Sequence, residues 1–381
     1  MLPEIKYLPV NWIDGMKISE SHFLQSENSI TDRIRDNAAI LISSNNYGLL
    51  KPKPGRDASF NLSINVDQSK LMRVKLLECR AITAGGMRIE IGGEYAASIN
   101  TFETKVDPVK DEEFYVVVAI NPYDRIPVGE PDPAEVPLRY PHVIPSYSLQ
   151  VINSVKINTN LNPAYHLIIG KIRTNGVEVV VDNDFIPPCS CISAFPKLKQ
   201  EYQELGGLLG EIGTYATTIV QKVKTEKQKT DLAINVNYLA EKIVFFLAEK
   251  IAKYRWTVSQ QPPVYMIETF LSFAYIIKSC IDCQTEKDRE SMITYFQEWT
   301  GLSPAQFQKR LNDVIEIEYN HQDIALSIRE IKTFTQVMVK LFKQMSKLKY
   351  IGDQVDSGVV IGETREQKKP EPKRGWSFLN D

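Results

Sequence analysis

Residues Val10–Gln25 read Val-Asn-Trp-Ile-Asp-Gly-Met-Lys-Ile-Ser-Glu-Ser-His-Phe-Leu-Gln, and they combine more special residue types than any other window of this length. Two large apolar residues, Trp12 and Met16, flank the turn dipeptide Asp14-Gly15. Glycine tolerates positive φ, so the chain can reverse here while both apolar side chains reach one surface. We therefore expect this stretch to act as a tether.

A long first helix is predicted directly after this turn. Ser19 or Ser21 can cap its N-terminus, because a hydroxyl accepts a hydrogen bond from a backbone N–H of the first turn. One helical face then carries residues at three- and four-residue spacing, namely Phe23, Glu27, Ile30, Ile34, Ala38 and Leu41.

The same stretch resembles the N-terminal signature of the TssK family, the baseplate proteins of bacterial type VI secretion systems. In that signature Trp-x-Glu-Gly-Met is followed by Pro-Gln-His-Phe-Gln. The matching residues are Trp12, Gly15, Met16, His22, Phe23 and Gln25. The departures are Asp14, Ile18, Glu20 and Leu24, where the family has Glu, Leu, Pro and Gln. Three weaker echoes extend the resemblance to about Leu348: Phe185–Cys189, Pro263–Tyr265 and Tyr319–Ile324. A divergent member is implied.

The chain predicts an α+β protein of two domains and a tail. From about Phe60 to Asp182 apolar residues alternate with period two, which predicts an antiparallel β-sandwich or barrel-like sheet. A proline-rich loop, 122–145, interrupts it and cannot be a central strand. The predicted boundaries are 1–193 for a β-rich shoulder domain with a long first helix, 194–350 for an elongated helical bundle, and 351–381 for a flexible C-terminal tail.

The helical half opens with a stripe of apolar residues from Leu198 to Val223 at heptad-like spacing, which predicts a bundle or coiled-coil seam. A row of small residues, Gly206, Gly210 and Gly213, lies beside it and predicts close helix approach. The resemblance implies a homotrimer. The residues assigned to the oligomer interface are Leu205, Leu209, Ile212, Ala216 and Ile219.

Composition argues against several classes of protein. A net charge of −2 gives no general attraction for nucleic acid or anionic membranes. The N-terminus does not resemble a secretory signal, so a cytoplasmic location is favoured, and the apolar run from Val264 to Ile281 carries two charges and is interpreted as a buried helix. The five cysteines have neither disulfide-framework nor zinc-ribbon spacing. The four histidines lie in separate segments, so no catalytic, cofactor or metal site is predicted.

The resemblance implies a structural adaptor that links the baseplate wedge to the membrane complex at the inner-membrane-docked baseplate. The implied partners are wedge proteins of the TssF and TssG type, the sheath-baseplate assembly and a membrane-complex protein, without nucleic acid or direct membrane insertion. The segment from Trp12 to Phe23 either docks on the wedge or anchors the first helix to the sheet. The residues assigned to the wedge contact are Trp12, Gly15, Met16, His22 and Phe23.

The tail is the predicted contact with the membrane complex, because larger family members carry a C-terminal head domain for which this chain has no room. Its candidate residues are Lys373, Arg374, Trp376 and Phe378, two basic groups followed by two aromatic anchors. Two alternatives stay open: a phage-tail receptor-binding-like protein, or, as the weakest hypothesis, an enzyme without a recognisable motif. A receptor binder is expected to end in a β-rich head, and this chain ends in helix and tail.

Overall fold

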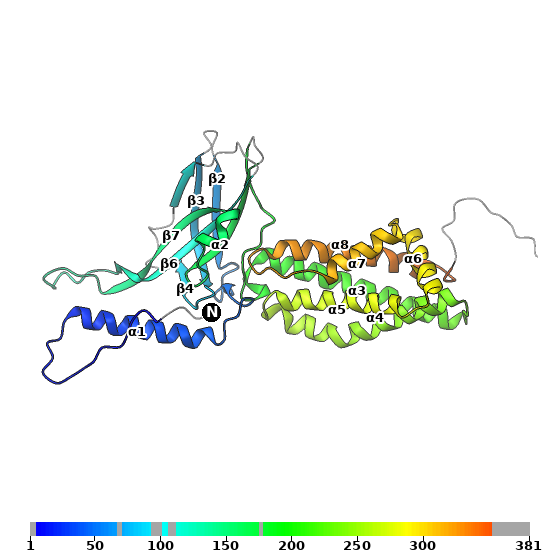
Figure 1. Cartoon of the computed structure of the whole chain (residues 1–381), viewed down its shortest axis with the longest axis horizontal. Helices are drawn as coiled ribbons and strands as arrows, with labels where there is room; N and C mark the ends of the chain where they lie inside the picture. Colours follow the sequence, from blue (N-terminus) through cyan, green and yellow to red (C-terminus); the bar gives the residue numbers. More distant parts are fainter. Residues whose placement is uncertain (1–4, 67–70, 93–100, 106–111, 175–177, 353–381) are drawn as a thin grey trace, which may run out of the picture.

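The computed structural model describes residues 5–66, 71–92, 101–105, 112–174 and 178–352. The molecule is elongated, with two β-sheets and the first helix at one end and a bundle of helices at the other (Figure 1). This arrangement agrees with the α+β class predicted from the sequence. The division of the chain at residues 193 and 194 stays a prediction, and the change from strands to helices falls between Val181 and Pro196.

The first sheet is antiparallel and is built around the long strand β3. Its strands are β1 (Gly48–Leu49), β2 (Phe60–Val66), β3 (Leu71–Ile82), β4 (Arg88–Ile91) and β5 (Thr101–Lys105). β1, β2, β4 and β5 all pair with β3. One edge of β3 is shared by two short strands, because β4 pairs with its C-terminal part and β5 with its N-terminal part.

The second sheet has the strand order β7-β6-β8-β9 and packs against the first. Its strands are β6 (Glu113–Val128), β7 (His142–Asn153), β8 (His166–Thr174) and β9 (Val179–Val181). A Cβ added at Gly170 of β8 would lie 3.1 Å from Leu62 and 3.3 Å from Ile64 of β2, so the two sheets meet closely at this glycine. Two short helical segments, η1 (Ser154–Lys156) and α2 (Ile157–Asn160), connect β7 to β8.

The proline-rich segment is a two-stranded ribbon for much of its length. β6 pairs with β8 only from Glu113 to Ala119, whereas its pairing with β7 continues to Val128 opposite His142. Beyond Ala119 one edge of β6 is therefore free of strand pairing, and an open edge tolerates proline because no ladder bond is lost there. Pro122 lies where the register shifts, between Asn121 and Arg125. The loop predicted at 122–145 is thus largely an arm made by the strands themselves (Figure 1).

The segment that follows the sheets is held tightly to β1. Leu49 donates its N–H to the carbonyl of Pro188 at 2.8 Å, and Ser190 donates its N–H to the carbonyl of Leu49 at 2.9 Å. Gly48 has φ +105°, and a Cβ there would lie 2.1 Å from the Pro188 oxygen, so only glycine fits. The bonds of Leu49 form an isolated parallel bridge between Leu49 and Cys189, directly after the two prolines. The segment then continues through η2 (Ile192–Ala194) into the bundle.

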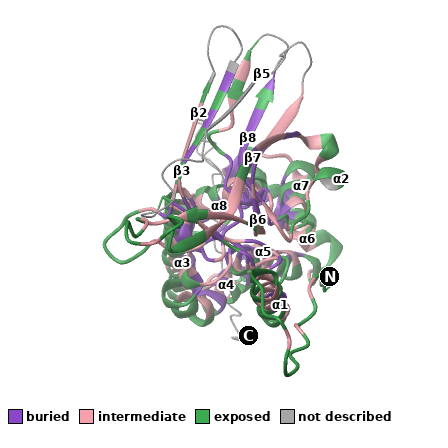
Figure 2. Cartoon of the chain, turned by 90° about the vertical axis from the view of Figure 1, so that its left-hand side faces the viewer, coloured by how far each residue is buried: buried purple, intermediate pink, exposed green. Residues whose placement is uncertain are grey.

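Six long helices form the bundle, and their apolar stripes face inward (Figure 2). Their bounds are α3 (Pro196–Thr225), α4 (Asp231–Trp256), α5 (Val264–Asp282), α6 (Glu286–Thr300), α7 (Pro304–Ile315) and α8 (Ile324–Lys347), with η3 (Val258–Gln260) between α4 and α5. α3 packs against both α4 and α8. A Cβ at Gly206 would lie 2.8 Å from the ring of Tyr254 and one at Gly213 3.0 Å from Leu247, so these two glycines permit the close approach of α3 and α4.

Within the described residues, α5 is the one helix long and apolar enough to cross a membrane by length and composition. Eight of its side chains are buried in the bundle, including Phe270, Phe273 and Ile277. It packs against α4, α7 and α8. Its apolar character is accounted for by these contacts, in line with the buried helix predicted from the sequence.

A buried polar cluster joins the bundle to the sheets. Lys171 of β8 and Asp323, which precedes α8, form an ion pair of 3.1 Å between side chains that are 5% and 7% exposed. Burial opposes the charged form of Lys171, but the hydrogen bond to Asp323 and its charge outweigh burial and raise the pKa of this lysine. His321 lies next to this pair. Its Nε2 donates to the carbonyl of Tyr47 at 2.9 Å, and its Nδ1 accepts from the Tyr319 hydroxyl at 2.7 Å.

Candidate functional site

The N-terminal segment 5–19 folds back over the start of α1 (Glu20–Ala39). The Trp12 ring lies 6.2 Å from the ring of His22 and 6.3 Å from that of Phe23. The amide of Gln25 donates to the carbonyl of Leu8 at 3.3 Å. Gly15 takes φ +79° at the tip of the turn. Three residues of the N-terminal signature, Trp12, His22 and Phe23, therefore lie together.

His22 has a structural role at the start of α1. Its Nδ1 accepts the backbone N–H of Ser19 at 3.1 Å and lies 2.8 Å from the Ser19 hydroxyl. This side chain thus caps a helix N-terminus, where backbone groups otherwise lack partners. Of the residues assigned to the wedge contact, Trp12 and Phe23 are about half exposed, at 50% and 57%, and both rings remain accessible.

The side of α1 that faces the sheets is polar. Ser29, Asp32 and Arg35 are its buried residues, and the latter two form an ion pair of 3.2 Å with side chains 1% exposed. Asp32 also accepts the backbone N–H groups of Lys6 at 2.9 Å and Tyr7 at 3.0 Å. These contacts fix the N-terminal segment and α1 to each other.

Two tyrosines complete this polar anchor of α1. Tyr123, at the base of the arm, donates its hydroxyl to Asp32, and Tyr165 accepts from Arg35 at 3.2 Å. Burial alone would raise the pKa of Asp32, but the bonds from Tyr123, Tyr7 and Lys6 and the charge of Arg35 outweigh burial and lower it. Burial and the bond to Asp32 raise the pKa of Tyr123, so its proton stays in place. The cluster is a fixed hydrogen-bonded anchor.

The arm lies beside α1 (Figure 1). Arg125 of β6 forms an ion pair with Glu27 of α1, and it donates to the side chain of Asn28 at 2.8 Å. The Tyr7 and Tyr123 rings are 4.8 Å apart, and the Lys6 ammonium lies 5.1 Å from the Tyr123 ring centroid. The contacts between α1 and the arm are therefore largely polar and aromatic.

The opposite side of α1 is apolar and exposed. Phe23, Ile30 and Ile34 recur at seven- and four-residue spacing, which places them on one helical face, and their exposures are 57%, 51% and 63%. We call the N-terminal apolar surface the set of exposed residues on this face and on segment 5–19: Ile5, Leu8, Trp12, Ile13, Ile18, Phe23, Ile30 and Ile34. In Figure 2 the exposed residues of α1 are mixed with residues of intermediate burial. So many exposed apolar side chains on one short segment mark an interaction surface.

The other predicted residues have different surroundings. The five assigned to the oligomer interface, from Leu205 to Ile219, are at most 1% exposed in the single chain, because they face the core of the bundle. A second copy cannot reach these side chains in this structure, so an interface on α3, which stays a prediction, would use its outer face. The four tail residues lie outside the described part of the chain. Within that part, no three His, Cys, Asp or Glu side chains are grouped as metal ligands.

Solved structures match this chain although no family model and no curated protein matches its sequence. A chain of "The baseplate complex from the type VI secretion system" aligns over 88% of this chain and 99% of its own length, with a TM-score of 0.52 and 11% identity. "Crystal structure of TssK" aligns over 88% of this chain and 68% of its own, with a TM-score of 0.50 and 15% identity. The chain has a TssK-like fold. A chain from a structure of a TssK-TssF-TssG baseplate subcomplex also aligns with this chain, with a TM-score of 0.46.

The sequence did not reveal the polar anchor of the TssK-like fold. Asp32 and Arg35 look like ordinary solvated charges, because the partners that bury them come from Tyr123 and Tyr165, far along the chain. One signal was available: charges three residues apart lie on the face opposite the apolar stripe. Which of the two faces turns toward the sheets depends on tertiary contacts.

Proposed function

We propose that this chain is a structural component of a type VI secretion baseplate: a trimeric, cytoplasmic adaptor between the baseplate wedge and the membrane complex. One observation carries the proposal most strongly, the likeness of fold over 88% of the chain to a protein in such a baseplate complex. The signature residues support it from a second direction, since Trp12, His22 and Phe23 are in contact and build the exposed N-terminal surface.

The wedge contact is proposed at the N-terminal apolar surface, with proteins of the TssF and TssG type as partners. Residues Ile30 and Ile34 extend the predicted contact from Trp12 and Phe23 along α1. Gly15 and Met16 shape the turn that presents Trp12, and His22 fixes the start of the helix. The polar anchor holds the surface in place, so little ordering is needed when a partner binds.

The buried titratable groups of the described residues support a structural role over a catalytic one. Lys171 and Asp323 neutralise each other at the junction, and Asp32 and Arg35 do so beneath α1. Each cluster is enclosed and joins two elements, whereas a catalytic group must reach a substrate.

The trimer and the membrane-complex contact complete the proposed adaptor. The trimer interface is proposed on outer faces of the bundle, because the heptad stripe of α3 is used within the chain. The tail residues from Lys373 to Phe378 are proposed to contact an acidic surface of a membrane-complex protein, with the basic pair steering and the aromatic pair anchoring.

Affinity capture from the native cytoplasm, followed by mass spectrometry, tests the assignment. The tagged chain is expected to recover wedge and sheath proteins. The double variant Ile30→Ser with Ile34→Ser should lose the wedge proteins, because two apolar contacts are removed from the proposed surface. Leu326→Ser is the matched control, since this leucine of α8 is also 51% exposed. Recovery of no baseplate protein by the unmodified chain would overturn the proposal, and equal recovery by all three would place the wedge contact elsewhere.

A further inference from the structure

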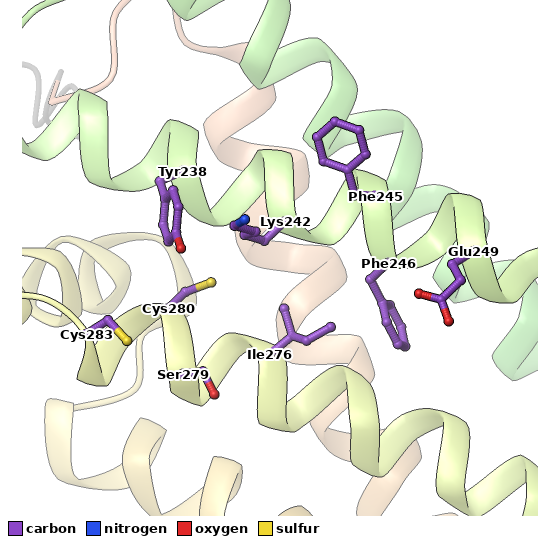
Figure 3. A pocket seen from close by; sticks show the side chains of 9 residues that line it. All are labelled: Tyr238, Lys242, Phe245, Phe246, Glu249, Ile276, Ser279, Cys280 and Cys283. Atoms are coloured by element: carbon purple, nitrogen blue, oxygen red, sulfur yellow. The ribbon is translucent and has the colours of Figure 1, made fainter.

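An apolar groove runs between α4 and α5 on the outside of the bundle (Figure 3). Its volume is about 300 Å³. Rings and aliphatic groups line most of it, with one cation and one carboxylate: Tyr238, Lys242, Phe245, Phe246, Glu249, Ile276, Ser279, Cys280 and Cys283. This surface is distant in sequence from the one proposed for the wedge.

The groove displays apolar side chains that the bundle does not cover. Phe245 is 70% exposed, whereas its neighbour Phe246 is 5% exposed and stacks on Phe273 at 6.0 Å between ring centroids. Tyr238, one helical turn before Lys242 on α4, is also exposed. Large rings left in water on one face indicate that another group binds there.

The chain leaves the described structure near one end of this groove. Ile351 donates its N–H to the Gln228 side chain at 2.8 Å, and Gly352 donates its own to the Tyr295 hydroxyl at 3.2 Å. A Cβ at Gly352 would lie 3.9 Å from Leu232, in the first turn of α4. Residues 353 onward therefore start beside the N-terminus of a helix that lines the groove.

The length of chain that follows suits the distance to the groove. Tyr238 lies six residues along α4 from Leu232 and Phe245 lies thirteen, which correspond to about 9 and 20 Å. Trp376 comes 24 residues after Gly352. An unfolded chain of that length has a root-mean-square span of about 27 Å, and tethered binding is most effective when the span and the distance are similar.

We propose that the segment Trp376-Ser377-Phe378-Leu379 docks in the α4–α5 groove of its own chain. Three large apolar residues in four positions suit a groove that presents the exposed rings of Tyr238 and Phe245 beside the partly buried Ile276. Lys373 and Arg374 precede them, and the groove carries the carboxylate of Glu249, which is 72% exposed and forms a surface ion pair of 2.9 Å with Lys250. This contact uses the aromatic residues that are also proposed to anchor the membrane-complex contact, so the two contacts are alternatives. It goes beyond the proposed baseplate role and does not depend on it.

Cys283 provides a direct test, because it lines the groove and is the one exposed cysteine of five. In the variant Ser377→Cys, diamide should form a disulfide between Cys283 and the introduced thiol, detected as a cross-linked peptide pair by mass spectrometry. The rate should be independent of protein concentration. Cys283→Ser in the same background should abolish this pair.

Gln367→Cys is the matched reference. This position is ten residues nearer to Gly352, and random collision favours the shorter tether by about twofold. Docking predicts the reverse: Ser377→Cys should form the disulfide at least tenfold faster than Gln367→Cys. Adding Phe245→Ala or Trp376→Ala should remove this difference in rate. Equal or inverted rates would overturn the proposal. A cross-link that forms only between chains, at a rate that rises with protein concentration, would also overturn the proposal, because the segment would then bind the groove of a second copy.

Discussion

The helices α1 and α3 use their amphipathic faces in opposite ways. α3 buries an apolar stripe from Leu198 to Val223 in the bundle and exposes Gly210, whose added Cβ would meet nothing within 4 Å. α1 instead buries Asp32 and Arg35. The comparison teaches that a periodic pattern identifies a face, whereas the packing of the whole chain determines whether that face is inside. The apolar face of α1 stays exposed in the single chain, and the wedge contact is proposed there.

The largest effect is expected from Leu209→Asp on α3. Leucine to alanine at a buried site costs about 2–5 kcal/mol, and a carboxylate adds a desolvation cost, so the bundle should unfold. Gly210→Ala, the next residue on the exposed side, should be neutral or stabilising by about 1 kcal/mol. Chemical denaturation followed by circular dichroism measures both. If Leu209→Asp instead gave a folded monomer, the apolar stripe of α3 would have to be an interface between copies of the chain.

Asp32→Ala should detach α1 while leaving α3 and its neighbours folded. The variant leaves the buried Arg35 charge and the Tyr123 hydroxyl without their main partner, a loss of about 3–5 kcal/mol for a broken buried pair. Hydrogen exchange should show lost protection in α1 and unchanged protection in α3–α8. Arg33→Ala is the control, since this charged residue of the same helix is exposed. Global loss of protection would mean that α1 contributes to the core after all.

The junction between sheets and bundle should make stability depend on pH. Burial lowers the pKa of His321 to about 4, below its usual 6.5, and the bond to the Tyr47 carbonyl opposes this only in part. Between these values the unfolded chain binds a proton that the folded chain does not, so stability falls as pH drops from about 7 to 4. The loss is about 3 kcal/mol. In His321→Gln the free energy of unfolding, measured by chemical denaturation at several pH values, should vary less between pH 7 and 4. An unchanged dependence on pH would contradict the role given to His321.

Trp12→Ala should have the smallest effect on stability. A fully buried indole would cost about 3–5 kcal/mol, but Trp12 is half exposed, so we expect less than about 2 kcal/mol. Thermal unfolding measures this, and capture of wedge proteins measures docking. Loss of capture with near-normal melting supports docking by this segment, and a stability loss at the full-burial level would make Trp12 an anchor of α1.

The sequence predicted the bundle well because its pattern is local. Leu198, Val223 and the five stripe residues assigned to the oligomer interface between them are all buried in α3. The antiparallel sheets were predicted for the same reason. The long strands β3 and β7 were not identified individually, and the arm was interpreted as a loop because its prolines are tolerated only at an edge that the topology creates.

The sites depended on distant partners and were predicted less completely. His321 and Asp323 lie just before α8 in the sequence, and the structure gives them bonds to Tyr47, which precedes β1, and to Lys171 of β8. No local pattern contains those pairings. Trp12 and Phe23 are about half exposed, and both alternatives for this segment, docking on the wedge and anchoring α1, stay predictions.

The polar inner side of α1 has a consequence for the order of folding. Because α1 adds little apolar area to the core, the sheets and the bundle can fold stably before α1 docks. Its docking then becomes a separate, low-energy opening and closing, of the kind that hydrogen exchange detects as a local unit. A newly made chain would therefore display its apolar stripe from the outset, and assembly with a partner would be the step that removes it from water.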